Sequence, residues 1–269
     1  MSDDFNLPAY LDRIGYHGSV KADLATLTAL HAAHVDKIPF EGMDPFLRRP
    51  VDIGLGSIQQ KLVNSRRGGY CFEQNTLFKA ALEAIGFSVT GLGGRVRWMS
   101  QPGSPLGPRE HMILSIDLPE GAFIADVGFG ACLLDRPLPL HGDSEHMTAM
   151  GTFRLTENDG MFSLSARQPV GWRKAYVFNL EPQISSDFEL GNWYTSTSPR
   201  VPFQRTLIIE RLANDRRYKL INNRFLVETR DGEICSERII SSAIDFALIL
   251  DEIFYITPPI PAEQIFSRF

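Results

Sequence analysis

Apolar residues recur at helical spacing through the first third of the chain. The pattern predicts a short helix around residues 10–14 that ends at Gly15, and a longer helix that Ser19 caps and that runs to Pro39. A further helix is expected around residues 58–63. The N-terminal part of the protein is therefore predicted to be helical.

The next helical pattern, over residues 76–86, follows the sequence Arg66-Arg-Gly-Gly-Tyr-Cys-Phe-Glu-Gln-Asn75. Its apolar residues share one face, and Gly86 can end the helix in the left-handed conformation. Cys71 therefore lies where a Gly-Gly turn becomes the first turn of a helix. Free N–H groups and the helix dipole stabilise negative charge there, which favours a reactive thiolate. Because most free cysteines are buried small hydrophobic residues, this position alone leaves a structural role open.

From Phe87 onward the pattern changes to that of strands. Asn158-Asp-Gly160 and Asp231-Gly232 mark hairpin turns, and Ser241 is expected to cap a final helix. The predicted strands cover residues 87–98, 111–118, 122–127, 152–156, 161–166, 172–180, 206–210, 218–220, 224–229 and 233–239. Helices followed by a run of strands predict an α+β protein with segregated lobes.

Composition limits the classes of function. The chain has 269 residues, 43% of them hydrophobic, so it can bury a sizeable core in two or three lobes. A net charge of -5 argues against a general nucleic-acid surface, and an anionic ligand would need a local group of donors. We find no signal peptide and no apolar run long enough for a membrane span. Three widely spaced cysteines without a C-x-x-C pair fit a reducing cytoplasm and argue against zinc.

A nucleophilic cysteine needs a base and a group that orients the base. His111 begins an apolar strand and Asp126 ends the next one, so an antiparallel hairpin would bring the two together. A carboxylate in an apolar run is costly unless it is hydrogen-bonded, and an imidazole N–H is the obvious partner. The residues alone leave open an edge-strand histidine and a turn-stabilising aspartate. The remaining histidines lack such a setting, and His31 and His34 are interpreted as packed or surface residues.

These motifs resemble those of the arylamine N-acetyltransferase family. The similarity covers most of the chain and is specific because the motifs occur together and in order. They are Ile38-Pro-Phe-Glu41, Arg66 to Asn75, His111-Met-Ile-Leu, Asp126-Val-Gly-Phe-Gly130, and Trp193-Tyr-Thr-Ser-Thr-Ser-Pro199 with Phe203. The resemblance implies a catalytic triad of Cys71, His111 and Asp126, without a metal.

The resemblance also implies the architecture, with a core related to papain-like and transglutaminase enzymes. A helical bundle over residues 1–85 would carry the nucleophile, and a β-barrel over 86–188 would carry the histidine and aspartate. An interdomain segment over 189–209 would lead to an α/β lid over 210–269.

The implied activity is ping-pong transfer of acetyl from acetyl-coenzyme A, through an acetyl-cysteine, to arylamines, arylhydrazines or, by O-transfer, arylhydroxylamines. Phe40, Val96, Phe129 and Phe203 match positions that line the acceptor pocket in relatives, and Gly128-Phe129-Gly130 matches a segment near bound coenzyme A. The partners would be these small molecules, with no nucleic acid and no membrane. The sequence leaves the oligomeric state open.

Two departures from the family pattern concern the expected pocket. Gly42-Met43 replaces a common Asn-Leu, and Val201 stands where Ser is frequent, so acceptor preference is open. Arg67 and Glu73 would pair around the catalytic turn or be solvated. Cys132 and Cys235 are interpreted as structural.

Three other functions remain compatible with the sequence. The same triad would serve a thiol hydrolase or transglutaminase-like enzyme, or an amide synthase of a polyketide pathway. A binding module with an inactive triad is a further alternative, and in that case Cys71 would be no more reactive than the other two cysteines.

Overall fold

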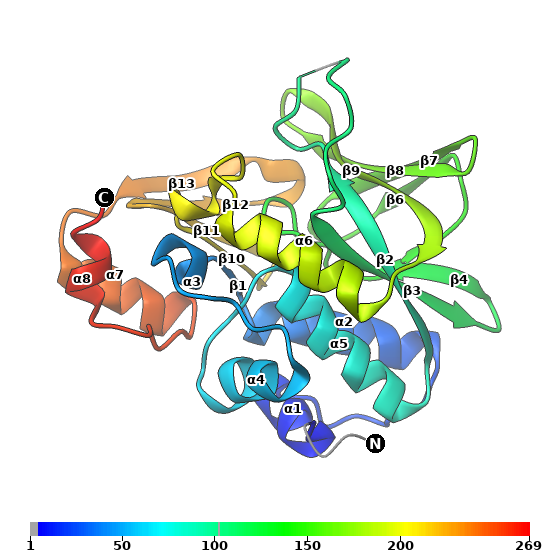
Figure 1. The fold of residues 1–269 in the computed structure, drawn as a ribbon, viewed down its shortest axis with the longest axis horizontal. Coiled ribbons are helices and arrows are strands. Elements are labelled where there is room, and N and C mark those ends of the chain that lie inside the picture. Colours follow the sequence, from blue (N-terminus) through cyan, green and yellow to red (C-terminus); the bar gives the residue numbers. More distant parts are fainter. Residues whose placement is uncertain (1–4, 102) are drawn as a thin grey trace.

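The structure is a computed structural model, and it describes residues 5–101 and 103–269. Figure 1 shows three groups of elements: helices at the bottom, a curled sheet at the upper right, and a second sheet with the C-terminal helices at the left. The α+β class predicted from the sequence is confirmed. Within the described ranges, every helix is too short or too polar to cross a bilayer.

The helices are α1 (Leu7–Ile14), α2 (Leu24–Lys37), α3 (Met43–Phe46), α4 (Leu55–Ile58), α5 (Cys71–Ile85), α6 (Ser185–Thr197), α7 (Ala243–Leu248) and α8 (Ala262–Phe266), with π-helical turns at Gln59–Asn64 and Ile249–Ile253 and 3₁₀ turns at Pro202–Gln204 and Arg230–Gly232. Helices α1, α2, α5 and α7 follow the sequence signals, with corrections at the starts of α2 and α7, whereas α3, α6 and α8 were not predicted. Gly15 and Gly86 end α1 and α5 in the left-handed conformation, as predicted.

Ser19 does not cap α2. The cap is Asp23, whose carboxylate accepts a hydrogen bond from the Thr26 N–H at 2.8 Å. Similarly, Ser242 caps α7 in place of the expected Ser241, and α7 is followed by α8 rather than being the last helix. In both cases a residue with a similar capping side chain, one or four positions later, starts the helix.

The larger sheet has eight strands in the order β5-β4-β3-β2-β9-β8-β7-β6 and curls into a nearly closed barrel (Figure 1). Its strands are β2 (Ser88–Val96), β3 (His111–Leu118), β4 (Gly121–Ala125), β5 (Leu138–Pro139), β6 (Ser144–Met147), β7 (Thr152–Asn158), β8 (Met161–Gln168) and β9 (Gly171–Pro182). Each neighbouring pair is antiparallel. The β3–β4 hairpin therefore returns the chain to the place where β3 began.

The smaller sheet joins segments from both ends of the chain. It contains β1 (Phe40–Glu41), β10 (Ile208–Ala213), β11 (Arg216–Ile221), β12 (Arg224–Glu228) and β13 (Ile234–Ile239), in that order. Because β1 comes from the N-terminal helical region, the predicted bundle and the predicted lid share one sheet. The division of the chain at residues 85, 188 and 209 stays a prediction.

The apolar side chains gather in three cores that match the three groups of elements. The inward face of α5 packs Leu77, Phe78 and Leu82 into the first core. The second lies between the smaller sheet and α7, and the third fills the barrel. Burial of this apolar face, rather than helix propensity, holds α5 in place.

The corrected start of α2 gives a test of the fold. We expect Asp23→Ala to lower the free energy of unfolding, and with it the midpoint of urea denaturation, because the Thr26 N–H loses its acceptor. Ser19→Ala is the matched control, since Ser19 contributes its backbone carbonyl to the Tyr16 and Thr26 hydroxyls. Urea denaturation of both variants measures the difference. Equal losses in the two variants would contradict the assignment.

Candidate active site

Cys71 is the first residue of α5, and the turn before it is tightly packed. A Cβ on Gly68 would lie 2.0 Å from the carbonyl oxygen of Pro39, so only glycine fits there. Glu73, in the first turn, accepts a hydrogen bond from the Tyr70 N–H at 3.1 Å. The close contact at Gly68 and the capping hydrogen bond of Glu73 thus hold the turn that positions the Cys71 sulfur.

A buried ion network supports this turn, and its pairing differs from the sequence interpretation. Arg67 does not pair with Glu73. Its guanidinium bonds to Glu41 at 2.8 Å and to Asp44 at 3.2 Å. Lys61 instead approaches both Asp44 and Glu73 at 2.6 Å. The partners of Arg67 come from distant parts of the chain, which local sequence spacing could not reveal.

His111 and Asp126 meet at one end of the barrel. His111 is the first residue of β3, and Asp126 follows the last residue of β4, its antiparallel neighbour. The imidazole Nε2 lies 2.6 Å from Oδ2 of Asp126, and both side chains are buried. The other ring nitrogen, Nδ1, is then left for the thiol.

Asn75 connects this pair to the catalytic helix. Its amide donates to Asp126 Oδ1 at 3.0 Å and to the Met112 carbonyl at 2.8 Å, and its carbonyl accepts from the Val127 N–H at 3.1 Å. No role for Asn75 was predicted from the sequence. The available signal was its spacing of four residues from Cys71, which places both on one face of α5.

Charges at the site favour a protonated imidazole. Burial alone would lower the pKa of His111, but the Asp126 carboxylate and, to a smaller extent, Cys71 raise the pKa to about 10. Burial likewise opposes ionisation of Asp126, but His111, Asn75 and the Gly128 N–H outweigh it and hold the pKa of that carboxyl below its usual value. The pair is therefore an imidazolium and a carboxylate at neutral pH.

Two aromatic rings enclose the imidazole. The ring centroid of Tyr176 lies 4.9 Å from that of His111, and Phe129 lies 5.2 Å away nearly edge-on. Both rings exclude water from the ion pair. Tyr176 was missed by the sequence analysis because its position on β9 carries no local signal of function.

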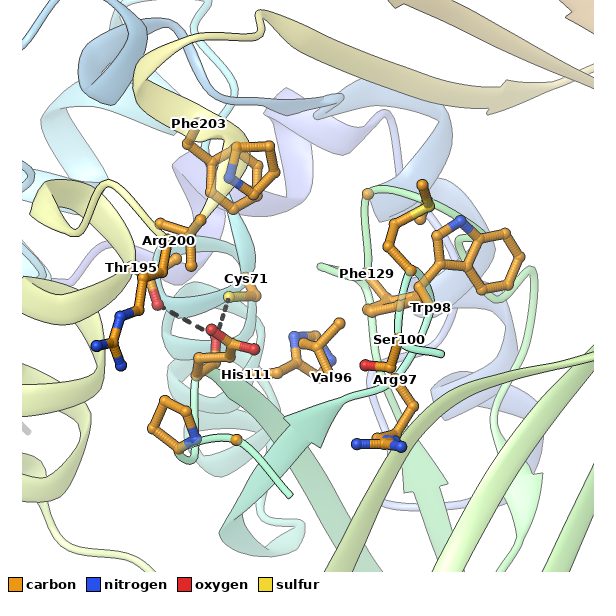
Figure 2. Close-up of a pocket in the computed structure, with 18 of the residues that line it drawn as sticks. Cys71, Val96, Arg97, Trp98, Ser100, His111, Phe129, Thr195, Arg200 and Phe203 are labelled. Carbon is orange, nitrogen blue, oxygen red and sulfur yellow. Dashed lines mark hydrogen bonds between the residues drawn. The ribbon is translucent and has the colours of Figure 1, made fainter. Parts of the chain in front are cut away.

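Cys71 and His111 line one cavity of about 440 Å³ (Figure 2). All four residues expected in the acceptor pocket, Phe40, Val96, Phe129 and Phe203, line the same cavity, as do Gly128 and Gly130. The structure thus brings every expected site residue except Asp126 to the cavity wall, and Asp126 lies behind His111.

The Gly128–Gly130 loop approaches the helix start closely. A Cβ on Gly128 would lie 2.6 Å from the Cys71 Cα, and a Cβ on Gly130 would lie 2.2 Å from the Phe40 ring. Both contacts are shorter than real side chains tolerate, so these glycines let the loop reach the helix. Tight packing here determines the shape of the cavity beside the sulfur.

The residues that depart from the family pattern lie in different places. Val201 lines the cavity, and a Cβ on Gly42 would lie 3.1 Å from the ring of Phe203. Met43, by contrast, is buried in the core beneath the smaller sheet. Gly42 and Val201 are therefore placed to affect the shape of the cavity, whereas Met43 does not line it.

The remaining cysteines and histidines lie away from the cavity wall. Cys132 is buried and Cys235 is exposed, and all three cysteines are free. His31 and His34 are fully buried and pack against Phe78. Within residues 5–101 and 103–269, no group of three or more metal-ligating side chains could hold an ion.

Comparison with known proteins identifies the family. The model of the N-acetyltransferase family matches residues 23–260. The chain belongs to the arylamine N-acetyltransferase family. It is 40% identical over 230 residues to the arylamine N-acetyltransferase of Mycolicibacterium smegmatis, covering 84% of this chain and 83% of that protein.

Two further relatives are informative. A Salmonella typhimurium protein named arylamine N-acetyltransferase / N-hydroxyarylamine O-acetyltransferase is 38% identical over 203 residues, 76% of this chain and 72% of its own. The structure of the Mycobacterium marinum arylamine N-acetyltransferase in complex with CoA matches with a TM-score of 0.91 at 31% identity, over 98% of this chain and 99% of that one. The chain is accordingly an acyltransferase, and the fold implied by the resemblance is confirmed.

The raised pKa of His111 gives a second test. Since the folded pKa of about 10 exceeds the ordinary 6.5, the charged imidazole stabilises the protein fully below pH 6.5, and this contribution is lost as the pH rises through 10. In Asp126→Asn we expect the pKa of His111 to fall from about 10 to near or below the ordinary 6.5, because burial remains while the opposite charge is gone. NMR titration of the ring protons measures the change.

Asp117→Asn is the matched control, since Asp117 is an exposed acid on the same strand. Its titration curve for His111 should coincide with that of the wild type. An unchanged curve in Asp126→Asn would show that the carboxylate does not hold the proton on the ring.

Proposed function

We propose that the protein transfers acetyl from acetyl-coenzyme A to aromatic amines and hydrazines by a ping-pong mechanism, with Cys71 as the nucleophile. The observation that carries the proposal is the cavity that Cys71 shares with a His111 held in an ion pair with Asp126. The CoA complex of the M. marinum relative supports the donor, and the names of the relatives support the acceptors.

In the first half-reaction, the Cys71 thiolate attacks the thioester carbonyl of acetyl-coenzyme A. A new thioester forms on the enzyme as the bond to coenzyme A breaks, so the acetyl group stays activated. The departing thiolate takes the proton of the His111 imidazolium. The imidazole is then neutral, and Asp126 holds it by Nε2 with Nδ1 free.

In the second half-reaction, an aromatic amine attacks the acetyl-cysteine. The neutral imidazole of His111 takes the proton from the attacking nitrogen, and the Cys71 thiolate leaves. The imidazolium and the thiolate are thereby restored together. The O-acetyltransferase name of the S. typhimurium relative supports the same step with a hydroxylamine oxygen as the nucleophile.

The oxyanion of each tetrahedral intermediate needs N–H donors near the sulfur. In the neighbouring loop, the Val127 and Gly128 N–H groups already donate to Asn75 and Asp126. We therefore assign the oxyanion to the first turn of α5, where N–H groups have no partner within the helix.

The aromatic walls of the cavity favour a flat acceptor over water. Phe40 and Phe203 pack with ring centroids 6.1 Å apart, and Phe129 faces them from the loop. A ring lying between such surfaces buries apolar area, which water does not. Exclusion of water also limits hydrolysis of the acetyl-enzyme.

The organisation and location of the protein belong to the same proposal. Residues 1–85 would present the nucleophile, residues 86–188 the base and its partner, and residues 189–209 and 210–269 would complete the cavity wall and cover it. The three free cysteines support a cytoplasmic location, where thiols stay reduced.

The covalent intermediate gives a direct test. Intact-protein mass spectrometry after mixing with acetyl-coenzyme A should show one added acetyl group on the wild type and none on Cys71→Ala. Cys235→Ala is the matched control, because it removes an exposed thiol and should be acetylated like the wild type. Acetylation of the Cys71→Ala protein would refute the assignment. Loss of acetyl-coenzyme A without an acceptor at the full rate would point to a hydrolase.

The role of His111 can be separated from that of the sulfur. We expect His111→Ala to slow alkylation of Cys71 by iodoacetamide at pH 7 by about 30-fold, because an ordinary thiol is only a few per cent thiolate at that pH. His141→Ala, an exposed histidine outside the cavity, should leave the rate unchanged. Rapid alkylation in both variants would remove the imidazole from the activating role.

A further inference from the structure

The cavity contains one acidic side chain among the described residues that line it, Glu110. The rest of its wall is mainly apolar and aromatic, with serine, threonine and tyrosine as neutral polar groups, and with two arginines and the His111 imidazolium as cations. An acid in such a place is costly unless something offsets the cost. A hydrogen-bond donor or a cation beside the carboxylate would offset this cost.

The backbone of Glu110 is fixed immediately beside the nucleophile. Its carbonyl faces both the Cys71 Sγ, at 3.8 Å, and the Thr195 hydroxyl, at 3.4 Å (Figure 2). Its N–H donates to the Gly94 carbonyl at 3.0 Å, and the next residue in the chain is His111. An acceptor that attacks an acetyl group on the sulfur must therefore pass close to this residue.

The carboxyl group of Glu110 has no hydrogen-bond or ion-pair partner within residues 5–101 and 103–269. Burial raises the pKa of this carboxyl, and the nearby His111 charge lowers it by less. The side chain is half-buried, so part of its hydration is lost without a replacement.

The two arginines of the cavity do not supply the missing partner. Figure 2 shows the guanidinium groups of Arg97 and Arg200 on opposite sides of the site, both directed away from Cys71. Arg97 is held by the Ser104 and Pro105 carbonyls at 3.1 and 2.9 Å. Among the described residues that line the cavity, Glu110 is therefore the one carboxylate, and the cation beside the sulfur, the His111 imidazolium, is already paired with Asp126.

We propose that Glu110 selects the class of acceptor, favouring aromatic amines with neutral, hydrogen-bond-donating or cationic ring substituents over those with an anionic substituent. The inference rests on the proposed function and deepens it. A donor or a cation on the ring supplies the partner that Glu110 lacks. A sulfonate or carboxylate on the ring instead meets a like charge in a partly dry site.

The acyl donor is not excluded by the same charge. The phosphates of coenzyme A are at the far end of a long neutral arm from the thioester, so they lie outside the inner cavity when the thioester reaches Cys71. The charge of Glu110 therefore affects only the acceptor, because the ring of the acceptor must enter the cavity together with its substituent. Glu110 therefore acts on the second half-reaction.

The test compares sulfanilamide with sulfanilate, which share the ring and the amine and differ in the charge of the para group. We expect the ratio of kcat/KM for sulfanilate to that for sulfanilamide to rise about tenfold in Glu110→Gln relative to the wild type, on the scale of repulsion between two partly solvated charges. It should rise further in Glu110→Lys. Because the two amines are the same for every protein, the difference in their intrinsic reactivity cancels when the ratio of a variant is divided by that of the wild type.

Glu120→Gln is the matched control, since it removes the same charge from an exposed turn between β3 and β4 and should keep the wild-type ratio. Equal ratios in the wild type, Glu110→Gln and Glu110→Lys would overturn the inference while acetylation of sulfanilamide still supported the proposed function. Lack of transfer to any amine by the wild type would instead refute the proposed function itself. Thermal melting of each variant checks that the fold is retained.

Discussion

The structure depends most on how the buried carboxylate of Asp126 is satisfied. A fully buried charge is tolerated only when hydrogen bonds replace its lost hydration, and Asp126 accepts from His111, Asn75 and the Gly128 N–H. These three donors belong to the start of a barrel strand, the catalytic helix and the loop after β4. One carboxylate therefore joins the parts of the fold that must meet for chemistry. The same bonds that stabilise the negative charge also aim the imidazole at the sulfur.

This arrangement imposes a steric condition on the loop. For its N–H to reach Asp126, the backbone of Gly128 must lie against the first turn of α5, closer than any side chain allows. Gly130 meets the same condition against Phe40. The glycines are thus required by close approach and not by left-handed conformation, since neither has a positive φ. Because protein interiors are close-packed, a shift of the first turn of α5 would also move the glycine loop that lines the cavity.

Much of this could be predicted from the sequence where the signals are local. Helix periodicity with Gly86 as the end signal located α5, and a short turn was enough to bring the β3 and β4 ends together. Local signals could not choose between Ser19 and Asp23, because both can cap a helix and only packing decides where α2 begins. Local signals also could not identify the partners of Arg67, because Glu41 and Asp44 come close to it only in the tertiary structure. Tyr176 was missed for the same reason: its ring reaches the site from a strand remote in sequence.

The smaller sheet positions the segment that follows the glycine loop, a part of the site that Cys71, His111 and Asp126 do not position. The buried side chains of Glu210 and Arg217 and the partly buried side chain of Lys219 bond to backbone groups of Ala131 and Leu133, directly after the glycine loop. Buried ion pairs add little net stability because desolvation offsets their attraction, so their effect here is to fix the position of this segment. Cys71 and His111 are thus positioned by the helix and the barrel, whereas the far wall of the cavity is positioned by the smaller sheet. Acceptor preference can then change through wall residues while the geometry of the reacting groups stays the same.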